Sequence, residues 1–156
     1  MNNQTTNQEL AFLSVDDLTR GYASKQFSPV EVTKACLSRI DAFNTIVNAF
    51  CFVDSEGAIK NAKDAENRWF RGEQLSPIDG VPTSTKDTTM VKGWISSFGS
   101  RVFGMTTPSE EETSCVTRLR EAGAILLGLT NSPEIGWKGV TDSLLHGATR
   151  NPWNTD

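Results

Sequence analysis

The residue with the clearest capacity for chemistry is Lys86, which stands near the end of the stretch S-P-I-D-G-V-P-T-S-T-K-D at residues 76–87. Gly80 allows a tight turn, and the chain then runs out as a short strand that delivers Lys86 at its end. Burial disfavours the charged form of a lysine, and a neutral lysine can act as a general base. The alternative interpretation is a solvated lysine beside Asp87, which is the commoner state of lysine in proteins.

Other residues that carry chemistry favour structural roles. His146 is the one histidine of the chain, and its Leu-Leu-His-Gly setting is more typical of a structural residue than of a base. The loop serines are interpreted as turn residues, and none is proposed as a nucleophile without a base within its reach: Ser96, Ser97 and Ser100. The sequence shows neither a phosphate-binding glycine motif nor a ligand cluster, so we expect no cofactor and no metal.

The composition is that of an ordinary globular protein. With 156 residues, the chain is long enough for one domain with a core and too short to make two domains the expectation. A net charge of -4 without any basic cluster favours neither nucleic acid nor an anionic membrane surface as a partner. The longest continuous apolar run, residues 124–127, is far too short for a membrane span.

The three cysteines are widely separated and odd in number, which fits neither a disulfide framework nor a metal site. Each lies in an apolar context, so we expect buried free thiols in a reducing compartment: Cys36, Cys51 and Cys115. The polar first residues lack the basic flank and apolar stretch of a signal peptide. A cytoplasmic location is the expectation.

The first half of the chain predicts helices around one strand. After a frayed tail over residues 1 to about 10, Ser14 with Asp17 begins a short helix. Ser28 and Glu31 begin a longer one around Pro29, with an apolar stripe at helical spacing: Val32, Cys36, Ile40 and Phe43. Residues 47–53 are apolar and predict a strand. A further helix is capped by Asp54 or Ser55, ends at Gly72 and has a face of small residues: Ala58, Ala62, Ala65 and also Trp69.

The second half predicts a strand, a helix and a buried strand. The first strand covers residues 81–85, and the helix begins at Ser109 with three acidic residues in its positive first turn: Glu110, Glu111 and Glu112. Its buried face would hold Cys115, Val116, Leu119 and Ala122. Gly123 ends the helix, and the apolar residues 124–130 follow as a strand covered on both faces. Because the carboxyl ends of parallel strands meet at one edge, we expect Lys86 and Asn131 to lie close together there.

Five motifs in order resemble the amidase signature family. The first three are P-I-D-G-V-P-x-x-x-K-D at residues 77–87, F-G-S-R at residues 98–101, and V-T-R-L-R-E-A-G-A-I-L-L-G-L-T-N at residues 116–131. The next are S-P-E-I-G-W at residues 132–137 and G-A-T-R-N-P-W-N at residues 147–154. The resemblance covers nearly the whole chain from about residue 10. It implies the N-terminal part of an α/β/α sandwich with a central mixed sheet and N-terminal helices packed outside.

The resemblance also implies a function. Family members hydrolyse or transfer amides with a nucleophilic serine, a second serine that bridges, and a lysine, which here would be Lys86. The loop that contains Gly136 and Trp137 would border the substrate channel of a small-molecule amide. We expect residues 1–156 to be a single incomplete domain, helical over 1–75 and strand-helix-strand over 76–156, because the sequence ends before either serine. These residues alone should therefore be inactive, and a homodimer of the full-length protein is left open.

Two alternatives to a simple amidase stay open. One is the glutaminase subunit of a tRNA-dependent amidotransferase, which shares the same motifs. The other is a non-catalytic remnant that binds a partner through an open sheet edge.

Overall fold

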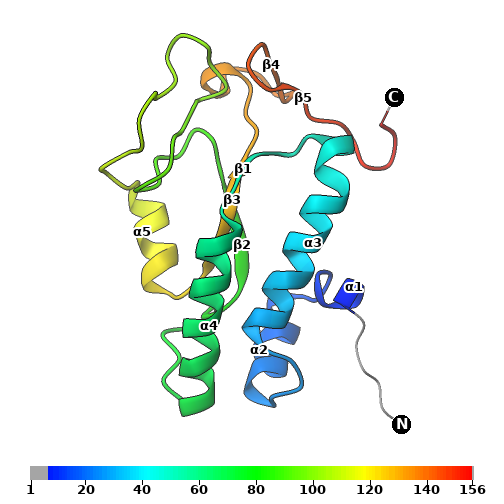
Figure 1. The fold of residues 1–156 in the computed structure, drawn as a ribbon, viewed down its shortest axis with the longest axis vertical. Coiled ribbons are helices and arrows are strands. Elements are labelled where there is room, and N and C mark those ends of the chain that lie inside the picture. The colour runs from blue at the N-terminus through cyan, green and yellow to red at the C-terminus, as the bar shows by residue number, and fades with distance from the viewer. Residues whose placement is uncertain (1–6, 156) are drawn as a thin grey trace. The chain divides into compact units, whose positions relative to one another are not determined.

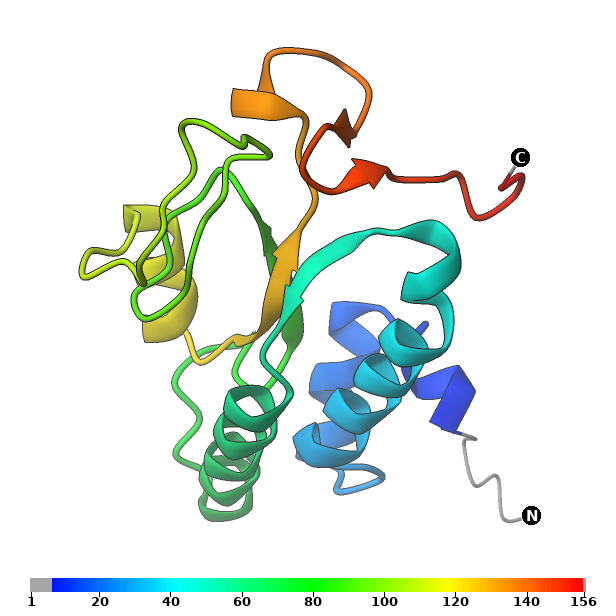
Figure 2. The same ribbon diagram turned by 45° about the horizontal axis from the view of Figure 1, so that its top comes forward.

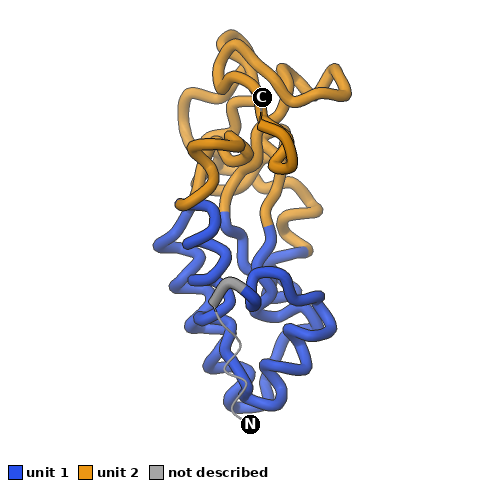
Figure 3. The backbone as a smooth tube through the Cα atoms, turned by 90° about the vertical axis from the view of Figure 1, so that its right-hand side faces the viewer, with its two compact units in different colours: residues 1–41, 54–83, 119–127 blue, residues 42–53, 84–118, 128–156 orange. Residues whose placement is uncertain are grey.

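The computed structural model describes residues 7–155, and the chain divides into two compact units (Figure 3). Unit 1 contains residues 1–41, 54–83 and 119–127, and unit 2 contains residues 42–53, 84–118 and 128–156. No helix in the described part of the chain is long and apolar enough to cross a membrane.

Unit 1 begins with α1 (Asn7–Leu10) and α2 (Val15–Ala23). The expectation of a frayed tail to about residue 10 is wrong for α1, because Leu10 is only 3% exposed and belongs to the apolar core. Residues 1–6 of that expected tail lie outside the described residues. Burial of a single leucine is enough to order this short turn of helix against α2.

The helix starts follow the local signals that the sequence carries. The Oγ of Ser14 accepts a hydrogen bond from the Asp17 main-chain N–H at 3.2 Å and caps α2. Ser28 and Glu31 form a reciprocal capping box at the start of α3 (Pro29–Val47). Asp54 caps α4 (Ser55–Arg71), and Gly72 ends α4 in the left-handed region at φ 72°. These predictions are confirmed.

The core of unit 1 forms between these helices. Both views show α2 beside the first turns of α3 (Figures 1 and 2), where a continuous set of apolar side chains is buried: Leu10, Leu18, Tyr22, Phe27, Val32, Ala35 and Val81. A second cluster joins the small-residue face of α4 to the strand β3 (Ile125–Thr130): Ala58, Ala62, Ile125 and Leu127. The alanine side chains allow α4 to lie close against that strand, as their spacing predicts.

The strands form a mixed three-stranded sheet in the order β1-β3-β2, with β1 (Phe50–Val53), β2 (Pro82–Lys86) and β3 (Ile125–Thr130). In unit 2, β1 pairs antiparallel with β3. Two hydrogen bonds connect β2 and β3: Ile125 N donates to Val81 O in unit 1, and Asp87 N donates to Thr130 O in unit 2. The residue numbers increase in the same direction along both strands, so the strands are parallel. The predicted mixed α/β fold is confirmed, and β3 is buried along nearly its whole length.

The predicted strand at residues 47–53 is shorter in the structure and begins at Phe50. Val47 is the last residue of α3, and a tight turn separates the two elements. The side-chain oxygen of Asn44 accepts from the main-chain N–H groups of Ala49 and Phe50 at 2.9 and 2.8 Å. This polar side chain ends the helix and starts the strand.

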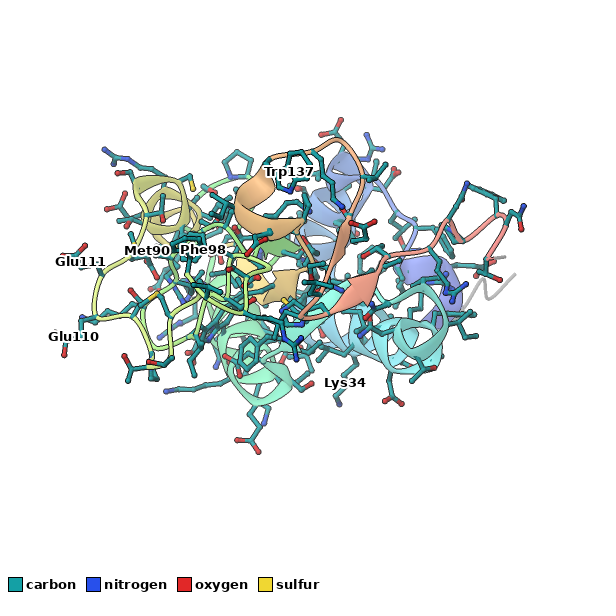
Figure 4. The ribbon with its side chains drawn as sticks, turned by 90° about the horizontal axis from the view of Figure 1, so that it is seen from above. Lys34, Met90, Phe98, Glu110, Glu111 and Trp137 are labelled. Carbon is teal, nitrogen blue, oxygen red and sulfur yellow. The ribbon has the colours of Figure 1, made fainter. Side chains whose placement is uncertain are left out.

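The prediction that a helix begins at Ser109 is wrong, because α5 covers Ser114–Glu121. Residues 109–113 pair instead with the preceding loop. Ser109 exchanges main-chain hydrogen bonds with Gly93 and Trp94, and Thr113 bonds in a similar way to Met90. The acidic residues Glu110 and Glu111 lie on an exposed connection and point outward (Figure 4), so they do not complement a helix dipole.

The expected burial of the thiols is also corrected. Cys115 is exposed on α5, and Cys36 and Cys51 are only partly buried. All three are free cysteines, as the sequence predicts. Val116 takes the buried position on α5 next to Cys115.

Candidate active site

Lys86 is the last residue of β2, and its Nζ donates a hydrogen bond to the main-chain carbonyl of Asn131, which follows β3. The prediction that these two strand ends meet is confirmed within unit 2. The side chain of Lys86 is exposed, so the described residues leave it open to solvent.

The next residue, Asp87, is the polar centre of the loop that follows β2. It is 1% exposed and accepts hydrogen bonds from Ser97 N at 2.7 Å, Ser97 Oγ at 2.5 Å and Gly99 N at 2.9 Å. A buried carboxylate is tolerated when several donors satisfy it. Asp87 thereby ties the F-G-S-R motif to the end of β2.

The F-G-S-R motif is also tied to the segment that follows β3, which contains the 3₁₀ turn η1 (Glu134–Gly136). The carbonyl of Phe98 accepts from Ile135 N at 2.7 Å, and Ser100 Oγ donates to Glu134 Oε1 at 2.6 Å. The F-G-S-R and S-P-E-I-G-W motifs, which are more than thirty positions apart in the sequence, are thus in direct contact.

Asn48 joins the last motif to the same end of the sheet. Its side-chain nitrogen donates to the carbonyls of His146 and Ala148 at 2.7 and 3.2 Å, beside the hairpin β4 (Asp142–Ser143) and β5 (Gly147–Ala148). Its own carbonyl accepts from Thr149 Oγ1 at 2.6 Å and from Asn131 Nδ2 at 2.8 Å. Unit 2 therefore gathers parts of all five motifs around the carboxyl ends of β2 and β3.

Two buried polar atoms at this end have no hydrogen-bond partner among the described residues. They are Asn131 Oδ1 and Ser132 Oγ, on residues that are 2% and 1% exposed. Leaving a buried acceptor unpaired costs about 1–3 kcal/mol. Both atoms can therefore accept a hydrogen bond from a further group at this end of the sheet.

One of the loop serines, Ser97, does have a possible base within its reach. His146 Nε2 lies 2.8 Å from Ser97 Oγ, and 3.9 Å from Asp87 Oδ2. The order nevertheless differs from a nucleophile triad, because Ser97 stands between the other two and donates its proton to Asp87. The structural interpretation of His146 and Ser97 therefore agrees with the hydrogen bonds.

Sequence reasoning missed a third residue at this position, Cys51 on β1. The Sγ of Cys51, a carboxylate oxygen of Asp87 and a ring nitrogen of His146 all lie within 4.8 Å of one another. Burial raises the pKa of Cys51 to about 12, and the negative charge of Asp87 adds to this effect. No sequence spacing indicates this cluster, because its members are on three separate elements.

The two residues predicted to bind substrate lie on the η1 loop. Trp137 lies at the η1 turn (Figure 4) and is 75% exposed. It lines a depression of about 410 Å³ with residues of η1 and of the β4-β5 hairpin. Lys138 lies in the same depression, with its Nζ 5.7 Å from the centroid of the Trp137 ring. Gly136 turns toward Thr88 instead, since a Cβ there would meet Thr88 Cγ2 at 3.7 Å. The substrate role of both residues stays a prediction.

Comparison with known proteins places this arrangement in a family. The amidase family model matches residues 31–156. The acylamidase of Rhodococcus erythropolis is 38% identical over 148 residues, which are 95% of this chain and 31% of that protein. A glutamyl-tRNA(Gln) amidotransferase subunit of Salinispora tropica is 39% identical over 94% of this chain and 30% of its own length.

Solved structures agree with this assignment. A bacterial aryl acylamidase of the amidase signature family superposes with a TM-score of 0.86 at 31% identity, over 94% of this chain and 31% of that one. The chain thus spans about a third of the length of the relatives that it matches. Over that third, sequence and fold agree throughout, and the chain belongs to the amidase signature family.

Proposed function

We propose that this chain supplies Lys86 as the general base of an amide-hydrolysing site, in a protein that also carries the two serines of the family. One observation carries the proposal: Lys86 bonds to the carbonyl of Asn131, at the point where parts of the five motifs converge. The unpaired atoms of Asn131 and Ser132 support a site at the same place. The ligand that we propose is a small-molecule amide, with neither nucleic acid nor a membrane as a partner.

In this proposal the nucleophilic serine attacks the amide carbonyl and passes its proton through the bridging serine to Lys86. Lys86 then returns a proton to the leaving amine. This Ser-Ser-Lys chemistry requires a neutral lysine. Because Lys86 is exposed in the described structure, its burial would have to come from the part of the protein that carries the serines.

The experiment that tests this role is a chimera, in which residues 1–156 replace the matching segment of the Rhodococcus erythropolis acylamidase. Lys86→Met in this chimera should lower the rate of amide hydrolysis by about a hundred-fold to ten-thousand-fold, which is the usual contribution of a general base. The matched control is Lys92→Met, because Lys92 is also an exposed lysine of unit 2. Activity that survives Lys86→Met would reject Lys86 as the base.

The 156 residues by themselves should show no amide hydrolysis, because the proposed nucleophile is not among them. Measurable turnover by the purified chain that disappears in Ser97→Ala would instead point to a different nucleophile. Gel filtration of the same sample would show whether it forms a homodimer.

A second candidate is the glutaminase role within a tRNA-dependent amidotransferase, which the 39% identity to the Salinispora tropica protein favours as strongly as the 38% identity favours acylamidase. Reading the encoding gene past the Asp156 codon and expressing the longest open frame separates the two. Hydrolysis of an aryl acylamide without any partner supports an acylamidase. Ammonia release from glutamine supports the glutaminase role.

A third hypothesis is the non-catalytic remnant. A stop codon directly after Asp156, together with a soluble chain that unfolds cooperatively, would support it.

A further inference from the structure

A cluster of metal-binding side chains lies within unit 2 and has no part in the proposed amide chemistry. Cys51 comes from β1, Asp87 from the residue after β2, and His146 from the turn between β4 and β5. Their donor atoms lie within 4.8 Å of one another. Three elements that are far apart in the sequence thus present a thiol, a carboxylate and an imidazole to one point.

The types of the three donor atoms favour a particular metal ion. A thiolate, an imidazole and a carboxylate are the ligands that Zn²⁺ prefers, with bonds of about 2.3, 2.0 and 2.1 Å. In a tetrahedral site, such bonds hold the nitrogen and oxygen ligands about 3.3–3.4 Å apart. His146 Nε2 and Asp87 Oδ2 are 3.9 Å apart, so a small movement of one side chain brings them to this spacing.

The surrounding hydrogen bonds hold two of the donors in place. Asp87 is fixed by main-chain N–H groups of Ser97 and Gly99. The turn that carries His146 is fixed at both sides, because His146 N donates to Ser143 Oγ at 3.0 Å and its carbonyl accepts from Asn48. These hydrogen bonds hold the carboxylate of Asp87 and the main chain of the turn that carries the imidazole.

We propose that Cys51, Asp87 and His146 bind a single Zn²⁺ ion, with a fourth position open to water. The thiol proton of Cys51 passes to solvent on binding, and neutral His146 presents the lone pair of Nε2 to the ion. Ser97 Oγ, which now bridges Asp87 and His146, turns aside to make room. The proposal stands independently of the amidase function, and it differs from the expectation, drawn from the sequence, that the chain holds no ligand cluster.

The first measurement is a titration of the full 156-residue chain with Zn²⁺ against a chromophoric chelator. We expect one Zn²⁺ ion per chain, and binding that is weaker by about tenfold or more in Cys51→Ser and in His146→Gln. The matched control is Cys115→Ser, because Cys115 is an exposed thiol outside the cluster. No binding by the unmodified chain, or equal binding by all variants, overturns the proposal.

The second measurement uses Co²⁺ alone as a spectroscopic probe. Thiolate coordination should produce a sulfur-to-cobalt charge-transfer band that is present in the unmodified chain and in Cys115→Ser, and absent from Cys51→Ser. If the band disappeared in Cys115→Ser instead, Cys115 and not Cys51 would be the thiolate ligand, and the proposal would be overturned. Should Cys51→Ser fail to fold by circular dichroism, His146→Gln decides, since its residue lies on a partly exposed turn.

Ser97→Ala separates a metal site from a hydrogen-bonded cluster. Removing the hydroxyl breaks the bridge between Asp87 and His146 but leaves all three ligands. We expect this variant to bind Zn²⁺ at least as tightly as the unmodified chain. Loss of binding would show that Ser97, rather than the proposed set, holds the ion.

Discussion

Gly99 lies directly against the main chain of Ser132. A Cβ atom built on Gly99 would come within 2.4 Å of Ser132 O, and Gly99 has a φ of 62°. This close approach allows the F-G-S-R loop to reach both Asp87 and the segment after β3. The glycine is therefore required on two grounds, its backbone conformation and the absence of a side chain.

Gly99→Ala should destabilise the chain by more than the cost of left-handed backbone alone. Gly93→Ala is the matched control, because Gly93 has a φ of 85° and nothing lies within 4 Å of the position that its Cβ would take. We expect about 1 kcal/mol for Gly93→Ala and a larger loss for Gly99→Ala, measured by urea unfolding. Equal losses in the free energy of unfolding would mean that the main chain at Ser132 moves away from the new Cβ without destabilising the chain.

Arg68 and Asp79 form a buried ion pair in unit 1. Asp79 is fully buried and accepts from Arg68 Nε at 2.8 Å, from Arg68 Nη2 at 2.6 Å and from Leu75 N at 2.9 Å. Arg68→Met leaves this carboxylate buried without its partner, so we expect a loss of about 3–5 kcal/mol in the free energy of unfolding.

The control for this ion pair lies three residues further along α4. Arg71 pairs with Glu73 at 3.1 Å, and both side chains are 60% exposed. Arg71→Met should cost about 0–1 kcal/mol. A similar small loss in Arg68→Met would show that Asp79 finds another partner or takes up a proton.

The parts of the fold that the sequence predicts well are those with local causes. Ser14, Ser28 and Asp54 cap helices by bonds to residues three positions away, so their effect is visible in any short window. The meeting of Lys86 with Asn131 follows from the direction of two parallel strands, which a strand-helix-strand pattern already implies.

The features that the sequence predicts wrongly, or does not predict, depend on contacts between residues far apart in the chain. The acidic run before α5 has the composition of a helix start, but Ser109 and Thr113 pair with residues near position 90, and tertiary pairing overrides the local signal. The cluster of Cys51, Asp87 and His146 combines three elements and leaves no spacing to recognise. The exposure of Lys86 likewise depends on which segments cover the edge of the sheet.

Ser132→Ala should be neutral or slightly stabilising in the 156-residue chain. Its Oγ is buried without a partner among the described residues, so removal of the hydroxyl relieves a desolvation cost. Ser96→Ala is the control, because the fully buried Ser96 donates to Thr89 O at 2.9 Å and should cost about 1 kcal/mol. Urea unfolding of both variants measures the difference, and a loss in Ser132→Ala equal to that in Ser96→Ala would reveal a partner for Ser132.

Tyr22 should make the stability of the chain fall at high pH. Its hydroxyl donates to Gly80 O at 3.0 Å in the core of unit 1, and burial raises its pKa above the usual value near 10. A raised pKa in the folded state means that the stabilisation is present below about pH 10 and is lost as the pH rises above it, because the unfolded chain releases the proton first.

This prediction has a direct readout, because Tyr22 is the single tyrosine of the chain. The near-ultraviolet absorbance of tyrosinate should rise near pH 10 in urea and only at higher pH, or together with unfolding, in the folded chain. The free energy of unfolding should begin to fall near pH 10 and keep falling as the pH rises further, and Tyr22→Phe should flatten that fall while losing about 1 kcal/mol at neutral pH from the missing hydrogen bond. If tyrosinate formed at the same pH in the folded chain as in urea, the Tyr22 hydroxyl would be exposed to water. Its placement in the core of unit 1 would then be wrong.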